Sequence, residues 1–87
     1  MNRDEIVRHL HIALSVVLNR EVTGLAPQAR LFEDLAMDST SVIELLMSLE
    51  DTMDLQIDPD ELTPDVFRTA GSLTDYIEAQ FARMARA

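Results

Sequence analysis

The stretch DSTSVIELLMSLEDTMD, residues 38–54, decides the fold of this chain. Its large apolar residues recur every three or four positions, which is the spacing of an amphipathic helix. A helix is therefore predicted from about Ser39 to Met53, with its apolar arc packed on a core. That inner arc consists of Val42, Leu45, Leu46, Leu49 and Met53. The aspartate and serine at the start of the stretch are residue types that favour helix caps.

The opposite arc of this helix mixes acidic and apolar side chains. It holds Thr40, Glu44, Met47, Asp51 and Asp54, with Ile43 at its edge. A purely solvated face rarely carries an isoleucine and a methionine among carboxylates, so we interpret the outer arc as a face that binds partners. A methionine also suits a surface that accepts several partners. The alternative is that single exposed apolar residues are common on protein surfaces.

Upstream of this helix, helical spacing predicts another over residues 2–20, capped by Asn2. Gly24 and Pro27 end that pattern. Residues 21–37 are expected to form a long loop. The apolar residues expected to hold the loop against the core are Val22, Leu25, Leu31, Phe32 and Leu35.

Downstream, two more helices are expected. The first is short, near residues 60–67, because Pro59 suits its first turn and Pro64 limits its length. The last begins at Ser72, with Asp75 as its capping partner. No segment alternates with a period of two. The predicted fold class is therefore all-α: a small four-helix bundle with three main helices and a short third one.

Length and composition limit what the chain can be. Its 87 residues suffice for one domain, so residues 1–87 are expected to form a single domain. The absence of cysteine excludes disulfides, thiolate metal sites and cysteine nucleophiles. No apolar run is long enough to span a membrane, and the first residues lack a signal-peptide pattern. A cytoplasmic location is therefore predicted.

The charge of the chain is strongly acidic and unevenly distributed. Sixteen acidic residues stand against seven arginines and no lysine, which gives a net charge of −9. Eleven of the acids and none of the arginines lie between Leu31 and Phe67. Such a field repels nucleic acid and anionic membrane surfaces, so neither is an expected partner. It favours a basic protein partner, although a simply solvated face is the alternative.

Residue patterns that support catalysis or metal binding are weak here. His9 and His11 diverge on a helix and cannot share a metal. Residues 58–61, DPDE, lack the glycine and closing glutamate of a calcium loop. Two glycines cannot build a glycine-rich phosphate loop. We therefore expect no metal site and no intrinsic catalysis.

Residues 34–40, DLAMDST, lie where the long loop becomes the helix. Taken alone, Asp38 or Ser39 could simply cap the helix. The stretch nevertheless resembles the signature of the acyl carrier protein family, Asp-Leu-Gly-x-Asp-Ser-Leu. Residues 42–51, 57–62 and 67–73 with 76–77 are similar to later segments of that family in the same order.

The sequence departs from the family pattern at two positions beside the serine. Ala36 replaces the usual glycine, and Thr40 replaces the usual leucine. Ala36 implies either that this turn needs no positive φ or that it tolerates some strain. Both departures bear on the choice of partner enzymes and cargo.

The resemblance implies a function as well as a fold. A phosphopantetheinyl transferase would attach 4′-phosphopantetheine from coenzyme A to Ser39, beside Asp38, and the thiol of the arm would carry acyl groups as thioesters. Partners would be acyl- or aminoacyl-loading, synthase and tailoring enzymes with basic docking patches, and the carrier itself would be a non-catalytic monomer. The docking residues implied are Asp38, Thr40, Ile43, Glu44, Met47, Glu50 and Asp51.

The pathway and the cargo stay open at this point. The departures favour polyketide or other specialised biosynthesis, including antibiotic biosynthesis, over fatty-acid synthesis. Because the chain begins at Met1 and ends soon after the last helix, a stand-alone carrier is expected. A peptidyl or aminoacyl carrier is the nearest alternative. An unmodified acidic helical adaptor that binds basic proteins is an alternative of a different class.

Overall fold

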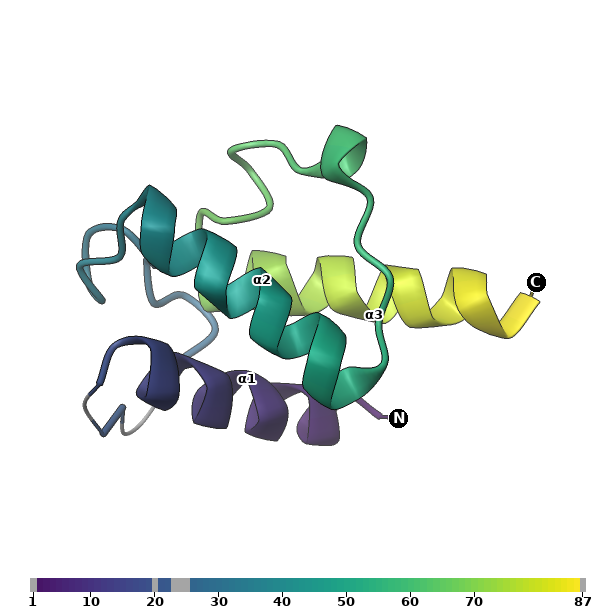
Figure 1. The fold of residues 1–87 in the computed structure, drawn as a ribbon, viewed down its shortest axis with the longest axis horizontal. Helices are drawn as coiled ribbons and strands as arrows, with labels where there is room; N and C mark the ends of the chain where they lie inside the picture. The colour runs from purple at the N-terminus through teal and green to yellow at the C-terminus, as the bar shows by residue number, and fades with distance from the viewer. Residues whose placement is uncertain (1, 20, 23–25, 87) are drawn as a thin grey trace.

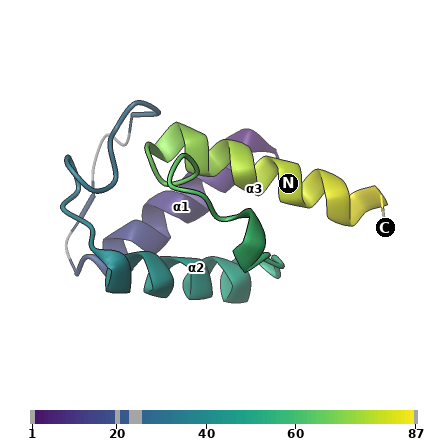
Figure 2. The ribbon, with the colours of Figure 1, turned by 90° about the horizontal axis from the view of Figure 1, so that it is seen from above.

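A computed structural model describes residues 2–19, 21–22 and 26–86, with only the backbone of Pro59 and Arg86. In this part of the chain every regular element is helical, so the predicted all-α class is confirmed. Helix α2 lies across one side of the molecule, with α1 and α3 on the other side (Figures 1 and 2). The elements are α1 (Arg3–Val17), α2 (Ser39–Met53), the 3₁₀ turn η1 (Pro59–Glu61) and α3 (Ala70–Arg86).

The core lies where α1 packs against both other helices. Leucines from all three helices and Ile77 are fully buried there. On α2 the buried residues are Val42, Leu45, Leu49 and Met53. These confirm the predicted inner arc, except that Leu46 is half-buried at its edge. Leu46 therefore contributes less to the core than its position in the arc predicted.

Helix α1 is shorter than the predicted range of 2–20. It ends at Val17, and a turn follows through Asn19, whose φ of 52° is left-handed. Its predicted cap is confirmed, because the Asn2 side chain accepts a hydrogen bond from the backbone N–H of Glu5 at 2.9 Å. The prediction that Gly24 ends the helix pattern lies outside the described residues.

The predicted short third helix over residues 60–67 is wrong in extent. One 3₁₀ turn, η1, is followed by a separate turn at residues 64–67. In this turn Phe67 donates its backbone N–H to the carbonyl of Pro64. Pro64 has no N–H of its own to continue a helix from η1, which explains the break. Figure 1 shows this whole segment arching from the end of α2 to the start of α3.

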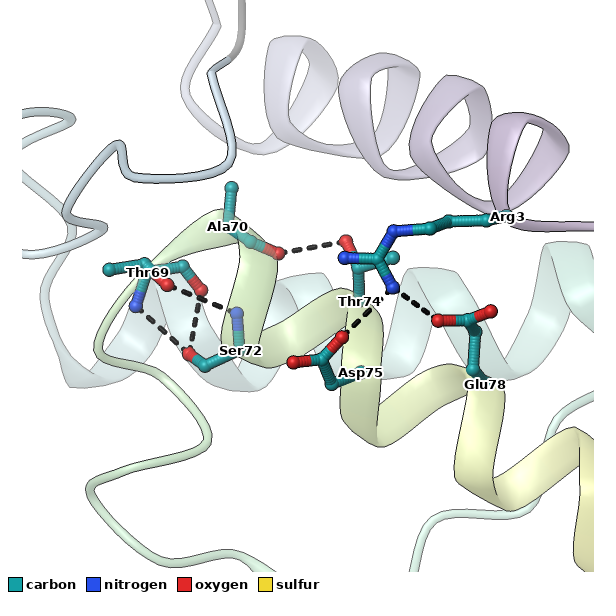
Figure 3. A network of polar contacts seen from close by, with 7 residues as sticks. All are labelled: Arg3, Thr69, Ala70, Ser72, Thr74, Asp75 and Glu78. Carbon is teal, nitrogen blue, oxygen red and sulfur yellow. Dashed lines mark hydrogen bonds and ion pairs between the residues drawn. The ribbon is translucent and has the colours of Figure 1, made fainter.

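Helix α3 begins two residues before the predicted start at Ser72. Its cap is a reciprocal pair: Ser72 donates its backbone N–H to the Thr69 hydroxyl, and Thr69 donates its own N–H to the Ser72 hydroxyl, both at 3.0 Å (Figure 3). Asp75 is not the capping partner. It accepts a hydrogen bond from Arg3 of α1, which also pairs with Glu78. These ion pairs tie the start of α1 to α3.

Candidate functional site: the start of helix α2

The loop before α2 is fixed to the segment that leads into α3. Ala70 and Gly71 donate their backbone N–H groups to the carbonyls of Ala29 and Pro27, at 2.9 and 2.8 Å. A Cβ at position 71 would lie 2.9 Å from that Pro27 oxygen, so this close approach requires glycine. Leu31 adds a weaker bond to the carbonyl of Arg68 at 3.4 Å. The loop therefore has a defined position relative to the core.

Arg30 and Asp34 close the next turn of this loop. The backbone N–H of Asp34 donates to the carbonyl of Arg30 at 2.8 Å, and its carboxylate accepts the N–H of Arg30 at 2.9 Å. The guanidinium of Arg30 reaches the same carboxylate at 3.2 Å. The pKa of Asp34 lies below its ordinary value. The hydrogen bond from the Arg30 backbone N–H is the largest cause, and the Arg30 side chain is the second. Asp34 thus stabilises the turn through its hydrogen bonds to Arg30.

The apolar residues of the loop do not all pack as predicted. Val22 and Leu31 are buried and Leu35 is half-buried, but Phe32 is 46% exposed. The expectation that Phe32 holds the loop to the core is therefore wrong, and Leu25 lies outside the described residues. Met37, which sequence analysis missed, is buried instead, at 4% exposure.

Ala36 explains why Met37 turns inward. Its φ of 56° is left-handed, so the alternative that this turn needs no positive φ is wrong. The turn adopts the strained conformation despite the alanine Cβ. Beyond it, Met37 donates its backbone N–H to the carbonyl of Leu31 at 3.2 Å, which closes the loop. Because Met37 lies in a loop, its burial is not part of a helical pattern of apolar residues and could not be predicted from spacing in the sequence.

Asp38 is the N-cap of α2. Its carboxylate accepts the backbone N–H of Ser41 at 2.8 Å, and its carbonyl accepts that of Val42 at 3.0 Å. The Ser41 N–H is the main cause that lowers the pKa of Asp38, so this carboxylate stays charged as a cap.

Because Asp38 caps the helix, the hydroxyl of Ser39 is not needed for that role. Ser39 is the first residue of α2 and is exposed, and its side chain forms no hydrogen bond with the described residues. The side chain sits at the positive end of the helix dipole, where backbone N–H groups point outward. An accessible hydroxyl at this position lies where a helix start stabilises a negatively charged group.

The remaining predicted site residues lie together on the outer side of α2. Ile43 and Met47 are 59% and 63% exposed, although both are large and apolar. Met47, Ser48, Glu50 and Asp51 border a shallow open depression. The acidic and polar members that are exposed are Thr40, Glu44, Glu50 and Asp51.

Two negative observations concern the described residues 2–19, 21–22 and 26–86. None of their acidic and histidine side chains group in a way that would hold a metal ion. None of their helices combines the length and apolar character needed to cross a membrane.

Comparison with known proteins identifies the family. The family model described as "Phosphopantetheine attachment site" matches residues 8–77. An acyl carrier protein of Exiguobacterium sibiricum is 30% identical over 80 residues, which are 92% of this chain and 99% of that protein. The chain belongs to the acyl carrier protein family. The carrier protein AsbD of Bacillus anthracis is 37% identical over 59 residues, 68% of this carrier and 65% of AsbD.

Solved structures agree with this assignment. The solution structure of a holo acyl carrier protein from Nitrosomonas europaea matches with a TM-score of 0.75 and 29% identity, over 87% of this carrier and 95% of that chain. One from Geobacter metallireducens, at 22% identity and a TM-score of 0.74, covers 92% and 90% and supports the fold.

Membership in the family establishes the class of function. This acyl carrier protein is a non-catalytic carrier whose prosthetic group is phosphopantetheine. Carriers of this family receive the group from a phosphopantetheinyl transferase and serve biosynthetic enzymes. When bound, the arm supplies the thiol that forms thioesters, a group that this cysteine-free chain lacks.

Proposed function

We propose that Ser39 is the residue that carries 4′-phosphopantetheine. The observation that carries this proposal is the exposed Ser39 hydroxyl, left unengaged at the start of α2 because Asp38 is the cap. The helix start favours a negatively charged phosphate ester through its dipole and its outward N–H groups. The role of Asp38 is then to define the helix start while its own charge stays beside the attachment point.

The outer side of α2 is proposed as the surface that docks partner enzymes. It combines two exposed apolar side chains, Ile43 and Met47, with nearby carboxylates and no arginine. Opposite charges on a partner would raise the association rate, and the apolar pair would add contact area. The docking residues are Asp38, Thr40, Ile43, Glu44, Met47, Glu50 and Asp51.

The cargo is proposed to be an acyl group in polyketide or other specialised biosynthesis. The support is Ala36 and Thr40, which depart from the usual glycine and leucine beside the attachment site. Fatty-acid synthesis and an aminoacyl or peptidyl cargo are the other outcomes.

The carrier is also proposed to be a monomer built as one domain over residues 1–87. A net charge of −9 supports this, because it opposes self-association.

The attachment site is tested by mass spectrometry of the intact protein after co-expression with a broad-specificity phosphopantetheinyl transferase. Wild type and Ser41→Ala should each gain one phosphopantetheinyl group, and Ser39→Ala should gain none. Cleavage after arginine releases residues 31–68 as one peptide, so fragmentation distinguishes Ser39 from Ser41 and Ser48. Modification at another serine, or none at all, would contradict the proposal. The mass of the thioester on protein from its own host would identify the cargo class.

A further inference from the structure

The chain enters the attachment site through a strained turn. Ala36 has a φ of 56°, a conformation that a residue with a Cβ rarely adopts. Such a conformation persists where the surrounding structure over-determines it. Here the surroundings are Arg30 and Asp34 on one side of Ala36 and the buried Met37 on the other.

Met37 is held in place by both its side chain and its backbone. The side chain is 4% exposed in the core, and the backbone N–H donates to the carbonyl of Leu31 at 3.2 Å. Leu31 is itself fully buried and bonded to the segment before α3. Met37 is therefore the last core anchor before the helix.

Only Asp38 separates this anchor from Ser39, and Asp38 is itself fixed. Its backbone is extended, with φ −119° and ψ −177°, and its carboxylate is held by the N–H of Ser41 at 2.8 Å. Both residues between the buried core and Ser39, Met37 and Asp38, are thus held by hydrogen bonds. A displacement of Met37 would therefore also displace the start of α2, including Ser39.

We propose that Met37 is a positioning residue for the modification of Ser39. Its side chain, turned inward by the left-handed Ala36, sets where α2 begins and how the Ser39 hydroxyl is presented to the transferase. This inference rests on the proposed role of Ser39. Group transfer depends steeply on the placement of the attacking atom, so a small displacement lowers the rate even when docking is unchanged.

The test compares two methionines that are matched in burial and lie at opposite ends of α2. Met37 and Met53 are 4% and 5% exposed, and Met53 is the last residue of α2. At 1.5 Å per residue, Met53 lies about 21 Å along the helix from Ser39. Met37→Ala and Met53→Ala should therefore lower the melting temperature similarly, whereas only Met37→Ala changes the surroundings of Ser39.

Steady-state transfer from coenzyme A by a purified broad-specificity transferase should separate the two variants. For Met37→Ala we expect kcat to fall about tenfold or more, with KM within about twofold because the outer side of α2 is intact. For Met53→Ala both constants should stay within about twofold of wild type. Met37→Leu, which restores a buried side chain of similar volume, should recover most of the lost kcat.

Each result has a separate meaning. Equal kcat for Met37→Ala and Met53→Ala, or a Met37→Ala effect confined to KM, would overturn the positioning role. If Met37→Ala does not fold, Met37→Val takes its place and should show a smaller loss in kcat. If wild type is not modified at Ser39, the proposed function fails, independently of Met37.

Discussion

Helix α2 has two faces that both carry large apolar residues but lie in opposite environments. On the inner face Leu45 and Leu49 are fully buried, whereas on the outer face Ile43 and Met47 are more than half exposed. Burial of large side chains stabilises the fold, but exposed ones contribute little to it. This helix therefore divides its apolar residues between a buried face that stabilises the fold and an exposed face that we propose docks partners, and the role of each face can be tested separately.

The largest effect on stability is expected from the inner face. Leu49→Ala should lower the free energy of unfolding by about 2–5 kcal/mol, because it removes a fully buried side chain and leaves a cavity. Leu46→Ala, at a half-buried position, should cost about 1–2 kcal/mol. Met47→Ala should cost less than about 0.5 kcal/mol. Urea denaturation measures all three, and equal losses at Leu49 and Met47 would contradict the assigned faces.

The two faces of α2 could be predicted because the signal is local. Helical spacing from Val42 to Met53 and a capping Asp38 both lie within one stretch, so no tertiary information was needed. The same local reasoning placed Ser39 at the first residue of the helix, where the structure has it. Leu46 differs because it lies at the edge of the inner arc, where the degree of burial also depends on the segment that covers it.

The errors arise where tertiary contacts decide the outcome. Helix α3 begins at Ala70, where Thr69 and Ser72 form the cap and the first two N–H groups of the helix donate to the carbonyls of Ala29 and Pro27. Those residues are about forty positions earlier, beyond the reach of a local pattern. Met37 was missed for a related reason. Its burial follows from the left-handed Ala36, which an alanine in the sequence does not indicate.

An intermediate effect is expected where the two faces meet, at the cap of α2. The folded-state pKa of Asp38 lies below its ordinary value of 3.8, chiefly because the Ser41 N–H stabilises the charged form. The contribution of this charge to stability is therefore fully present above the ordinary pKa. It is lost as the pH falls through the lower pKa of the folded state.

Asp38→Asn isolates this contribution, because asparagine caps helices about as well as aspartate but does not titrate. The melting temperature of wild type minus that of Asp38→Asn should be constant from neutral pH to about pH 5 and should decrease at lower pH. Thermal unfolding followed by circular dichroism gives this difference. A difference that stays flat down to acid pH would show that the Asp38 carboxylate gains nothing from its charge at the helix start.

The smallest effect on folding, and the sharpest separation of the two faces, is expected on the outer face. Glu44 and Asp51 are exposed, and neither forms an ion pair among the described residues. Glu44→Lys/Asp51→Lys should therefore change the free energy of unfolding by less than about 0.5 kcal/mol. It should nevertheless abolish most transfer by the transferase, because attraction to a basic docking patch becomes repulsion. Wild-type transfer should weaken as salt increases.

A matched control separates docking from net charge. Glu21→Lys/Asp60→Lys alters the net charge of −9 by the same amount at exposed positions outside α2. If transfer depends on the local face, this control should keep most of the wild-type rate at low salt, while the α2 double variant loses it through KM. Met47→Ala should also weaken transfer, but with the salt dependence of wild type, because it removes contact area and no charge. Equal losses of transfer rate in the two double variants would mean that the overall negative field attracts the partner. If both double variants instead transfer at the wild-type rate, the acidic face is only solvated.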